Sequence, residues 1–125
     1  ANNHEVDGMC KITGLSREAI IGQVPMVVFT CGSRGSILYM NGEDWHIPAI
    51  PVRMVDPTGA GDAYRAGFLT AFTRGIPPSS CARVGTVCAS FVVESAGCQT
   101  NLPDWKRMAD RYSQVFGKSD DLFGT

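Results

Sequence analysis

The sequence predicts an α/β fold in which helices pack on a sheet. After two short helical segments, strand-like segments come first and helix-like segments follow, which is typical of an α/β layer. A glycine-rich turn at residues 56–62 separates the two groups and opens the first of the later helices. The length of 125 residues suits one domain with a modest core.

The chain is expected to open with two short helices. Residues 2–14 have helix-compatible apolar spacing, and Gly14 is expected to end this helix. Ser16 has the residue type of an N-cap for a second helix over residues 16–22.

Three strands are expected, over residues 26–31, 37–40 and 44–50. The first is a continuous apolar, β-branched run, which predicts a strand buried on both faces. Asn41-Gly42 is a strong signal for a two-residue hairpin between the other two. Pro48 and Pro51 bracket the end of the third strand and make it an edge or exit segment.

Three helices are expected in the second half: from the glycine-rich turn to Gly75, over residues 80–95, and over residues 103–116. The middle helix is apolar nearly all round, so we expect it to be buried between other elements. The last is amphipathic, with Pro103 near its first position. The tail, residues 118–125, is expected to fray.

Composition excludes several classes of partner. A formal net charge of -1 argues against a polyanion such as DNA. No stretch approaches the roughly 20 apolar residues of a membrane helix, and no signal-peptide pattern opens the chain. The five cysteines are an odd number without CxxC spacing, so we favour reduced, buried thiols in a cytoplasmic protein over disulfides or a metal site.

The strongest chemical signal is the segment Asp56-Pro57-Thr58-Gly59-Ala60-Gly61-Asp62, directly followed by a helix. Small residues at 59–61 leave backbone N–H groups uncovered at a helix N-terminus, where the helix dipole also favours anions. A carboxylate at Asp62 could accept a proton from a substrate hydroxyl. An anion hole beside a base suits phosphoryl transfer to an alcohol. The simpler alternative is a glycine-rich turn with Asp62 as a helix cap.

The longer segment DPTGAGDAYRAGFL resembles the second signature of the ribokinase-like (PfkB) kinase family throughout its length. The resemblance implies the C-terminal part of a ribokinase-like three-layer α/β/α sandwich that uses ATP. It makes Asp62 the catalytic base. Gly59, Ala60 and Gly61, with the Asp62 amide, would form the anion hole for the γ-phosphate.

Two earlier segments follow the family's order. Asn2 and Glu5 match its NxxE motif, which implies that they organise Mg²⁺ and phosphate through water. The alternative is that they cap the first helix. Thr30, Gly32 and Gly35 resemble the TxGxxG turn that lies along the nucleotide phosphates, or they form a plain hairpin turn.

Later segments resemble the adenosine-kinase-like branch: Glu94 to Gln99 matches ExxGxQ, and DRYSQVFG resembles bacterial members. The resemblance makes Asp56 and the backbone of residues 92–97 candidates for a K⁺ site. An Asx turn before Pro57 explains Asp56 equally well. Arg65 could reach phosphate or cover the helix surface.

The resemblance covers residues 1–125, but only the ATP-binding, C-terminal portion of a single kinase domain. The chain lacks an initiator Met, and typical relatives are more than twice as long, so we expect a fragment or a processed product that is inactive alone. An adenosine-like nucleoside is the favoured acceptor, with a ribose-like sugar close behind. A homodimer formed through the parent protein stays open.

Two other classes of function remain: a nucleotide-binding fragment without catalysis, and a non-catalytic domain that reuses the fold. Weaker candidates point to no site. His4 and His46 lack metal-ligand spacing, which argues against zinc. Trp45 and Trp105 are expected to be packing residues, the latter as an apolar anchor of the last helix.

Overall fold

The computed structural model describes residues 1–118 of the chain. It divides into two compact units, Ala1–Ala49 and Ile50–Thr125. Apart from Lys118, the tail that is expected to fray lies outside the described residues. None of the described helices has the length and apolar character needed to cross a membrane.

The first unit begins with the two expected helices. Helix α1 spans Asn3–Thr13 and ends at Gly14, whose φ of 71° is left-handed and therefore favours glycine. Helix α2 spans Arg17–Ile21, and the Ser16 side chain caps it by accepting the N–H of Ala19.

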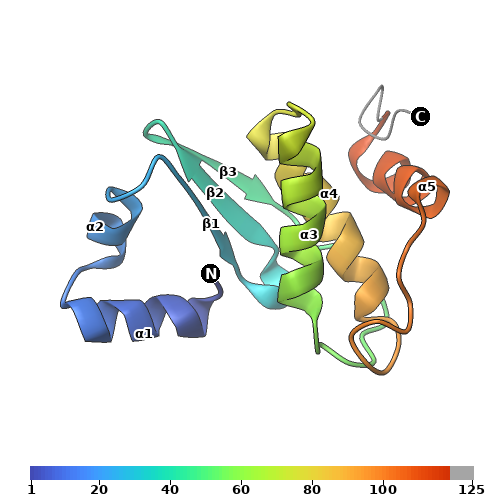
Figure 1. Ribbon diagram of the computed structural model, residues 1–125, viewed down its shortest axis with the longest axis horizontal. Coiled ribbons are helices and arrows are strands. Elements are labelled where there is room, and N and C mark those ends of the chain that lie inside the picture. Colours follow the sequence, from blue (N-terminus) through green and yellow to red (C-terminus); the bar gives the residue numbers. More distant parts are fainter. Residues whose placement is uncertain (119–125) are drawn as a thin grey trace. The chain divides into compact units, whose positions relative to one another are not determined.

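The strands of the first unit form an antiparallel sheet in the order β1-β2-β3 (Figure 1). Strand β1 spans Met26–Thr30, β2 spans Ser36–Met40 and β3 spans Glu43–Ile47. Asn41 and Gly42 join β2 to β3 with φ values of 55° and 77°, as a two-residue hairpin turn with two left-handed positions requires. The predicted hairpin and the edge position of β3 are confirmed.

The expectation that β1 is buried on both faces is wrong. Phe29 is buried, but Val27 and Val28 are only half-buried. Within the described residues, β1 is an outer strand with one full-length partner, β2. An outer strand is shielded less than the central strand that its apolar run suggests.

The second unit holds α3, Ala60–Thr73, α4, Pro78–Val92, and α5, Trp105–Phe116. Figure 1 shows α3 and α4 side by side, and glycines allow their close approach. A Cβ at Gly67 would lie 2.9 Å from Cys88 Cβ, and one at Gly85 would lie 2.8 Å from the Tyr64 carbonyl oxygen. The predicted burial of α4 is confirmed, since nine of its 15 residues are buried.

Several element boundaries differ from the prediction because of capping and proline. Helix α4 starts at Pro78, a residue type suited to the first helical turn, and ends at Val92. Helix α5 starts only at Trp105, because the Asp104 side chain accepts the Arg107 N–H at 2.8 Å and so acts as N-cap. Strand β3 stops at Ile47, directly before Pro48.

All five cysteines lie within the described residues and are free thiols. Burial raises the pKa of Cys81 to about 11, and it also raises the pKa of Cys88. The expectation of buried thiols is wrong for Cys98, which is exposed in the loop after α4.

Candidate functional site

Residues 57–62 form the turn at the start of α3 and include the first residues of that helix, and this turn needs glycine at position 59. Gly59 is the N-cap of α3 and has a φ of 82°. A Cβ there would also lie 2.4 Å from the Cβ of Cys98, a distance that real Cβ atoms essentially never show. Its carbonyl accepts the Ala63 N–H at 2.9 Å, which starts the helix. This turn is therefore shaped by contact with the loop after α4, and we call it the phosphate turn after the role that the sequence predicts for it.

The amides of the phosphate turn divide into engaged and open groups. The Ala60 N–H donates to the Pro57 carbonyl at 3.2 Å. Within residues 1–118, the N–H groups of Gly61 and Asp62 donate to no protein acceptor. A Cβ at Gly61 would meet nothing within 4 Å, so the space beside this residue is open, and we call the two amides without an acceptor the open amides. Open amides at a helix N-terminus are suited to binding an anion.

Asp62 lies in the first turn of α3 with an exposed carboxylate. Its Oδ1 accepts a hydrogen bond from Arg65 Nη1 at 3.0 Å. Within the described residues, Oδ2 has no protein partner. The carboxylate thus lies beside the open amides and retains acceptor capacity for an external hydroxyl.

Asp56 connects the phosphate turn to the loop after α4. Its Oδ1 accepts the Thr58 N–H and its Oδ2 accepts the Gly97 N–H, each at 2.9 Å. The bond from Gly97, followed by those from Thr58, lowers the pKa of the Asp56 carboxyl below its usual value. The Asx turn expected as an alternative is present, and it is combined with a contact across 41 residues of sequence.

One backbone carbonyl of the K⁺ site predicted near Asp56 already has two protein partners. The Val93 carbonyl accepts the N–H of Val55 at 2.8 Å and that of Asp56 at 3.2 Å. A carbonyl oxygen has two lone pairs, so both acceptor positions are occupied by protein. Each oxygen of Asp56 accepts one N–H and keeps a lone pair with which a cation could be held.

Asn2 and Glu5 form a capping box at the start of α1. Asn2 Oδ1 accepts the Glu5 N–H at 2.9 Å, and Glu5 Oε2 accepts the Asn2 N–H at 2.8 Å. The structural alternative for NxxE is therefore present. It remains compatible with a water-mediated role at Mg²⁺, because that ion keeps most of its own waters.

Thr30 and the turn after it lie next to Asn2 in the same unit. Asn2 and Thr30 form an isolated parallel bridge, and the Thr30 N–H donates to the Ala1 carbonyl at 2.9 Å. This single bridge places Asn2 beside Thr30, the last residue of β1. The structure thus brings together two motifs that are 28 residues apart.

The Thr30–Gly35 turn contains a short 3-10 helix, Gly32–Arg34. Gly35 has a φ of 86°, and a Cβ there would lie 2.0 Å from the Ile47 carbonyl oxygen. Gly32 has a φ of 57° but faces open space. Gly35 is thus required by the hairpin, whereas the space at Gly32 is open to a ligand.

The predicted site residues are divided between the two units. Asn2, Glu5 and the Thr30–Gly35 turn belong to the first unit, and Asp56 and the phosphate turn with Asp62 belong to the second. Within residues 1–118, no three His, Cys, Asp or Glu side chains gather as metal ligands.

Comparison with known proteins identifies the family. Residues 1–105 match the pfkB family of carbohydrate kinases. This chain belongs to the pfkB family. It is 40% identical over 111 residues to a nucleoside kinase of Methanocaldococcus jannaschii, a match that covers 88% of this chain and 37% of that protein.

Solved structures confirm a ribokinase-like α/β fold. The crystal structure of the M. jannaschii nucleoside kinase, an archaeal member of the ribokinase family, matches with a TM-score of 0.83 and 39% identity. That match covers 90% of this chain and 38% of that one. The nucleoside kinase of Burkholderia thailandensis in complex with inosine matches at 0.89 and 29% identity, covering 93% and 39% of the two chains.

A ribokinase of Arabidopsis thaliana, complexed with ribose and ATP, also matches, with a TM-score of 0.76 and 29% identity. The match covers 89% of this chain and 39% of that one. This pfkB family chain therefore spans about two fifths of the length of the relatives that it matches.

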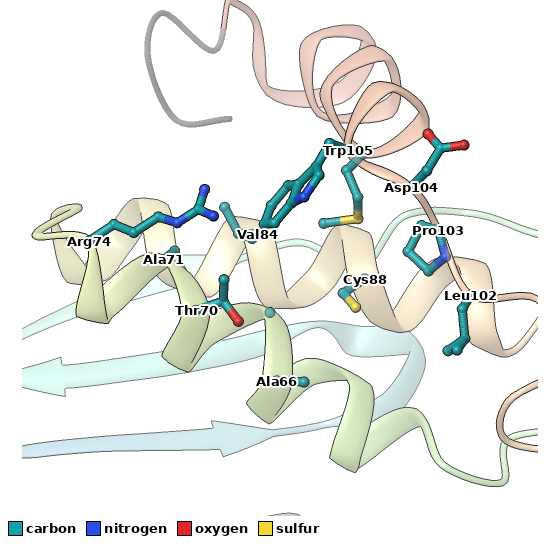
Figure 2. A pocket seen from close by; sticks show the side chains of 12 residues that line it. Ala66, Thr70, Ala71, Arg74, Val84, Cys88, Leu102, Pro103, Asp104 and Trp105 are labelled. Carbon is teal, nitrogen blue, oxygen red and sulfur yellow. The ribbon is translucent and has the colours of Figure 1, made fainter. Parts of the chain in front are cut away.

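Sequence reasoning about this pfkB family chain missed a groove of about 350 Å³ along α3, α4 and the start of α5 (Figure 2). Arg74 and Trp105 both line this groove, and the Arg74 guanidinium lies 4.4 Å from the Trp105 ring centroid. Trp105 is 51% exposed, so the expectation of an apolar anchor is wrong: its ring packs with Arg74 at the surface. None of the predicted site residues lines this groove. Its mostly apolar wall lacks the open amides that make the phosphate turn the candidate site.

Proposed function

We propose that this chain is the ATP-binding and catalytic part of a kinase that phosphorylates a hydroxyl of a nucleoside. The observation that supports this most is the phosphate turn, where the open amides of Gly61 and Asp62 lie beside the Asp62 carboxylate. Residues 1–125 would then form the C-terminal portion of one kinase domain. The relatives, of which this chain spans about two fifths, support that extent.

In the proposed reaction, Asp62 accepts the proton of the acceptor hydroxyl through its open carboxylate oxygen. The hydroxyl oxygen then bonds to the γ-phosphorus of ATP, and the bond from that phosphorus to the bridging oxygen breaks. The phosphorylated acceptor and ADP are released. The open amides stabilise the charge on the γ-phosphoryl oxygens during transfer.

Arg65 supports the role of Asp62 by position. It donates to Asp62 Oδ1 at 3.0 Å from one turn along α3, which orients the carboxylate and leaves Oδ2 for the acceptor. Both side chains are mostly exposed, so this pair contributes little to stability and more to orientation.

Asn2 and Glu5 would hold Mg²⁺ through water, and the ion would neutralise charge on the phosphate oxygens. Gly32 would let the Thr30–Gly35 turn approach the phosphates closely. Asp56 would contribute to a K⁺ site with backbone carbonyls other than that of Val93.

A nucleoside is the favoured acceptor, and a ribose-like sugar is the second candidate. The M. jannaschii relative is named a nucleoside kinase, and the B. thailandensis structure contains inosine. The sugar is supported by the more distant Arabidopsis ribokinase with its bound ribose and ATP.

The function is tested by Asp62→Asn in the full-length protein that carries this chain. We expect kcat to fall by roughly 10²- to 10⁴-fold, the contribution of a positioned general base, while ATP affinity stays near that of the wild type. Acceptor-dependent ADP release gives kcat, and calorimetry without acceptor gives the affinity for ATP.

Asp44→Asn is the matched control, because Asp44 is a mostly exposed carboxylate that pairs with His46 on β3. It should leave both measurements unchanged. An Asp62→Asn protein with near-normal turnover would rule out the role of the base. If the wild-type protein binds ATP but releases no ADP with any acceptor, a nucleotide-binding domain without catalysis is favoured.

A further inference from the structure

A cluster around Arg111 connects the last helix to the end of α4. Arg111 Nη1 lies 2.7 Å from Glu94 Oε1, and Nη2 donates to Glu94 Oε2 at 3.3 Å, so the pair is bidentate. Nη1 also donates to Ser90 Oγ at 2.9 Å, and the guanidinium carbon lies 3.6 Å from the Phe91 ring centroid. Side chains of Arg111 and Glu94 are only 21% and 27% exposed. Such a half-buried, charge-assisted pair is stronger than an exposed one.

Glu94 begins the loop that contacts the phosphate turn. Directly before it, the Val93 carbonyl accepts the amides of Val55 and Asp56. Three residues after it, the Gly97 amide donates to Asp56 Oδ2 at 2.9 Å. Cys98 follows, and its Cβ lies against the position where Gly59 lacks one. Glu94 thus lies between Val93 and Gly97, the two residues whose backbone groups bond to the segment just before the phosphate turn.

We propose that Arg111 is a positioning residue for the phosphate turn and acts through Glu94. This inference rests on the proposed function, because it concerns how the same turn is held for ATP. Arg111 fixes Glu94, Glu94 fixes the path of residues 93–98, and that path fixes Asp56 and Gly59. All of these contacts lie within the second unit.

The geometry requires arginine rather than any cation at position 111. A guanidinium presents several donors in a plane and stacks on an aromatic ring, so one group serves Glu94, Ser90 and the Phe91 face together. An ammonium could pair with the carboxylate but could not stack or bridge in the same way. Arg111→Lys should therefore keep the charge pairing with Glu94 but lose the other contacts, whereas Arg111→Met should lose all of them.

The alternative is that Arg111 only anchors α5, and an ion pair elsewhere on that helix provides the control. Lys106 Nζ lies 2.9 Å from Asp110 Oδ2, and Lys106→Met removes this pair. Both side chains of this pair are mostly exposed, and both belong to α5, so the pair does not connect α5 to the loop of residues 93–98. Arg111→Met, Arg111→Lys, Glu94→Gln and Lys106→Met form the set to compare in the full-length protein.

The first measurement is the alkylation rate of Cys98 by iodoacetamide, followed by peptide mass spectrometry. Cys98 is exposed and touches the turn, so its rate reports the local structure of the loop without needing turnover. We expect Arg111→Met and Glu94→Gln to raise the rate by roughly 2- to 30-fold, the span of couplings through such networks. A variant that combines Arg111→Met with Glu94→Gln should have an alkylation rate close to that of either single variant, because both side chains belong to one contact. Lys106→Met should not change the rate.

The second measurement separates the KM for ATP from the KM for the acceptor. Arg111→Met should raise the KM for ATP over the same rough range and leave the KM for the acceptor unchanged, because the contacts end at the phosphate turn. Arg111→Lys should give an intermediate value.

The inference is overturned if Arg111→Met and Lys106→Met have equal Cys98 rates and equal KM values for ATP, whatever their stabilities. If Arg111→Met does not fold, Glu94→Gln provides the same comparison, and a wild-type Cys98 rate in that variant also overturns it. Failure of the proposed function looks different, since wild type would then lack acceptor-dependent turnover while the alkylation comparison still reports the contact.

Discussion

Gly59 and Gly61 stand two residues apart and are glycine for different physical reasons. Gly59 has a left-handed φ of 82° and no room for a Cβ next to Cys98. Gly61 is within α3 and has open space around it. The first residue is therefore needed by the fold, and the second is available to a ligand.

Substituting each glycine with alanine separates these roles. Gly59→Ala should destabilise the protein by about 1–3 kcal/mol, the usual cost of such a backbone conformation for a non-glycine residue. Gly61→Ala should unfold at the same or a higher denaturant concentration, since alanine favours helix by up to about 1 kcal/mol. It should still weaken ATP binding by roughly tenfold, because a methyl group beside the amides hinders their bonds to charged oxygens.

Urea unfolding and calorimetry with ATP in the absence of acceptor check the two effects. If Gly61→Ala binds ATP as tightly as the wild type, the open amides of the phosphate turn do not contact phosphate. That outcome would contradict the assignment even if Gly59→Ala behaves as expected.

At this scale, the sequence indicates residue types better than their partners. Asp62 could be singled out as the candidate base because it directly follows a glycine-rich turn and precedes a helix. The bond of Asp56 to Gly97, and the pairing of Arg111 with Glu94, follow from no spacing in the sequence. Such contacts depend on how a loop folds back onto an earlier turn, and local propensities do not determine that path.

At the scale of elements, α3 and α4 depend on glycine for their close packing. A Cβ at Gly85 would meet the Tyr64 carbonyl oxygen at 2.8 Å, and backbone atoms cannot move aside as a flexible side chain can. Gly85→Ala should therefore destabilise the protein by about 1–3 kcal/mol through overpacking. Thermal or urea unfolding measures this change.

Gly8→Ala is the matched control for Gly85→Ala. Gly8 is also inside a helix, and a Cβ there would meet nothing within 4 Å. This variant should be neutral or more stable, because alanine is the better helix former. Equal destabilisation by both variants would mean that close α3–α4 packing is not the cause.

Elements with a strong local signal were predicted well. The Asn41-Gly42 hairpin, the Gly14 helix end and the Ser16 cap are all present because each depends on a few neighbouring residues. The burial of β1 was predicted wrongly, since the number of partner strands decides it and an apolar run does not state that number. Helix α5 begins at Trp105 for a different reason: the Asp104 side chain caps it, and the prediction from Pro103 missed this local signal.

At the scale of the whole molecule, the chain supplies about two fifths of the relatives that it resembles. The described residues hold the candidate phosphate turn and the candidate base, and no part of them has been assigned to acceptor binding. The acceptor could therefore be proposed only from relatives, of which the nucleoside kinase of M. jannaschii is 40% identical.

Acceptor-dependent ADP release by the full-length protein tests the central claim most directly. ATP, Mg²⁺ and K⁺ are supplied with adenosine, inosine or ribose, and with no acceptor as the baseline. We expect ADP release well above that baseline with a nucleoside and less with ribose. A folded protein that binds ATP but releases no ADP above the baseline with any of these acceptors would contradict the account.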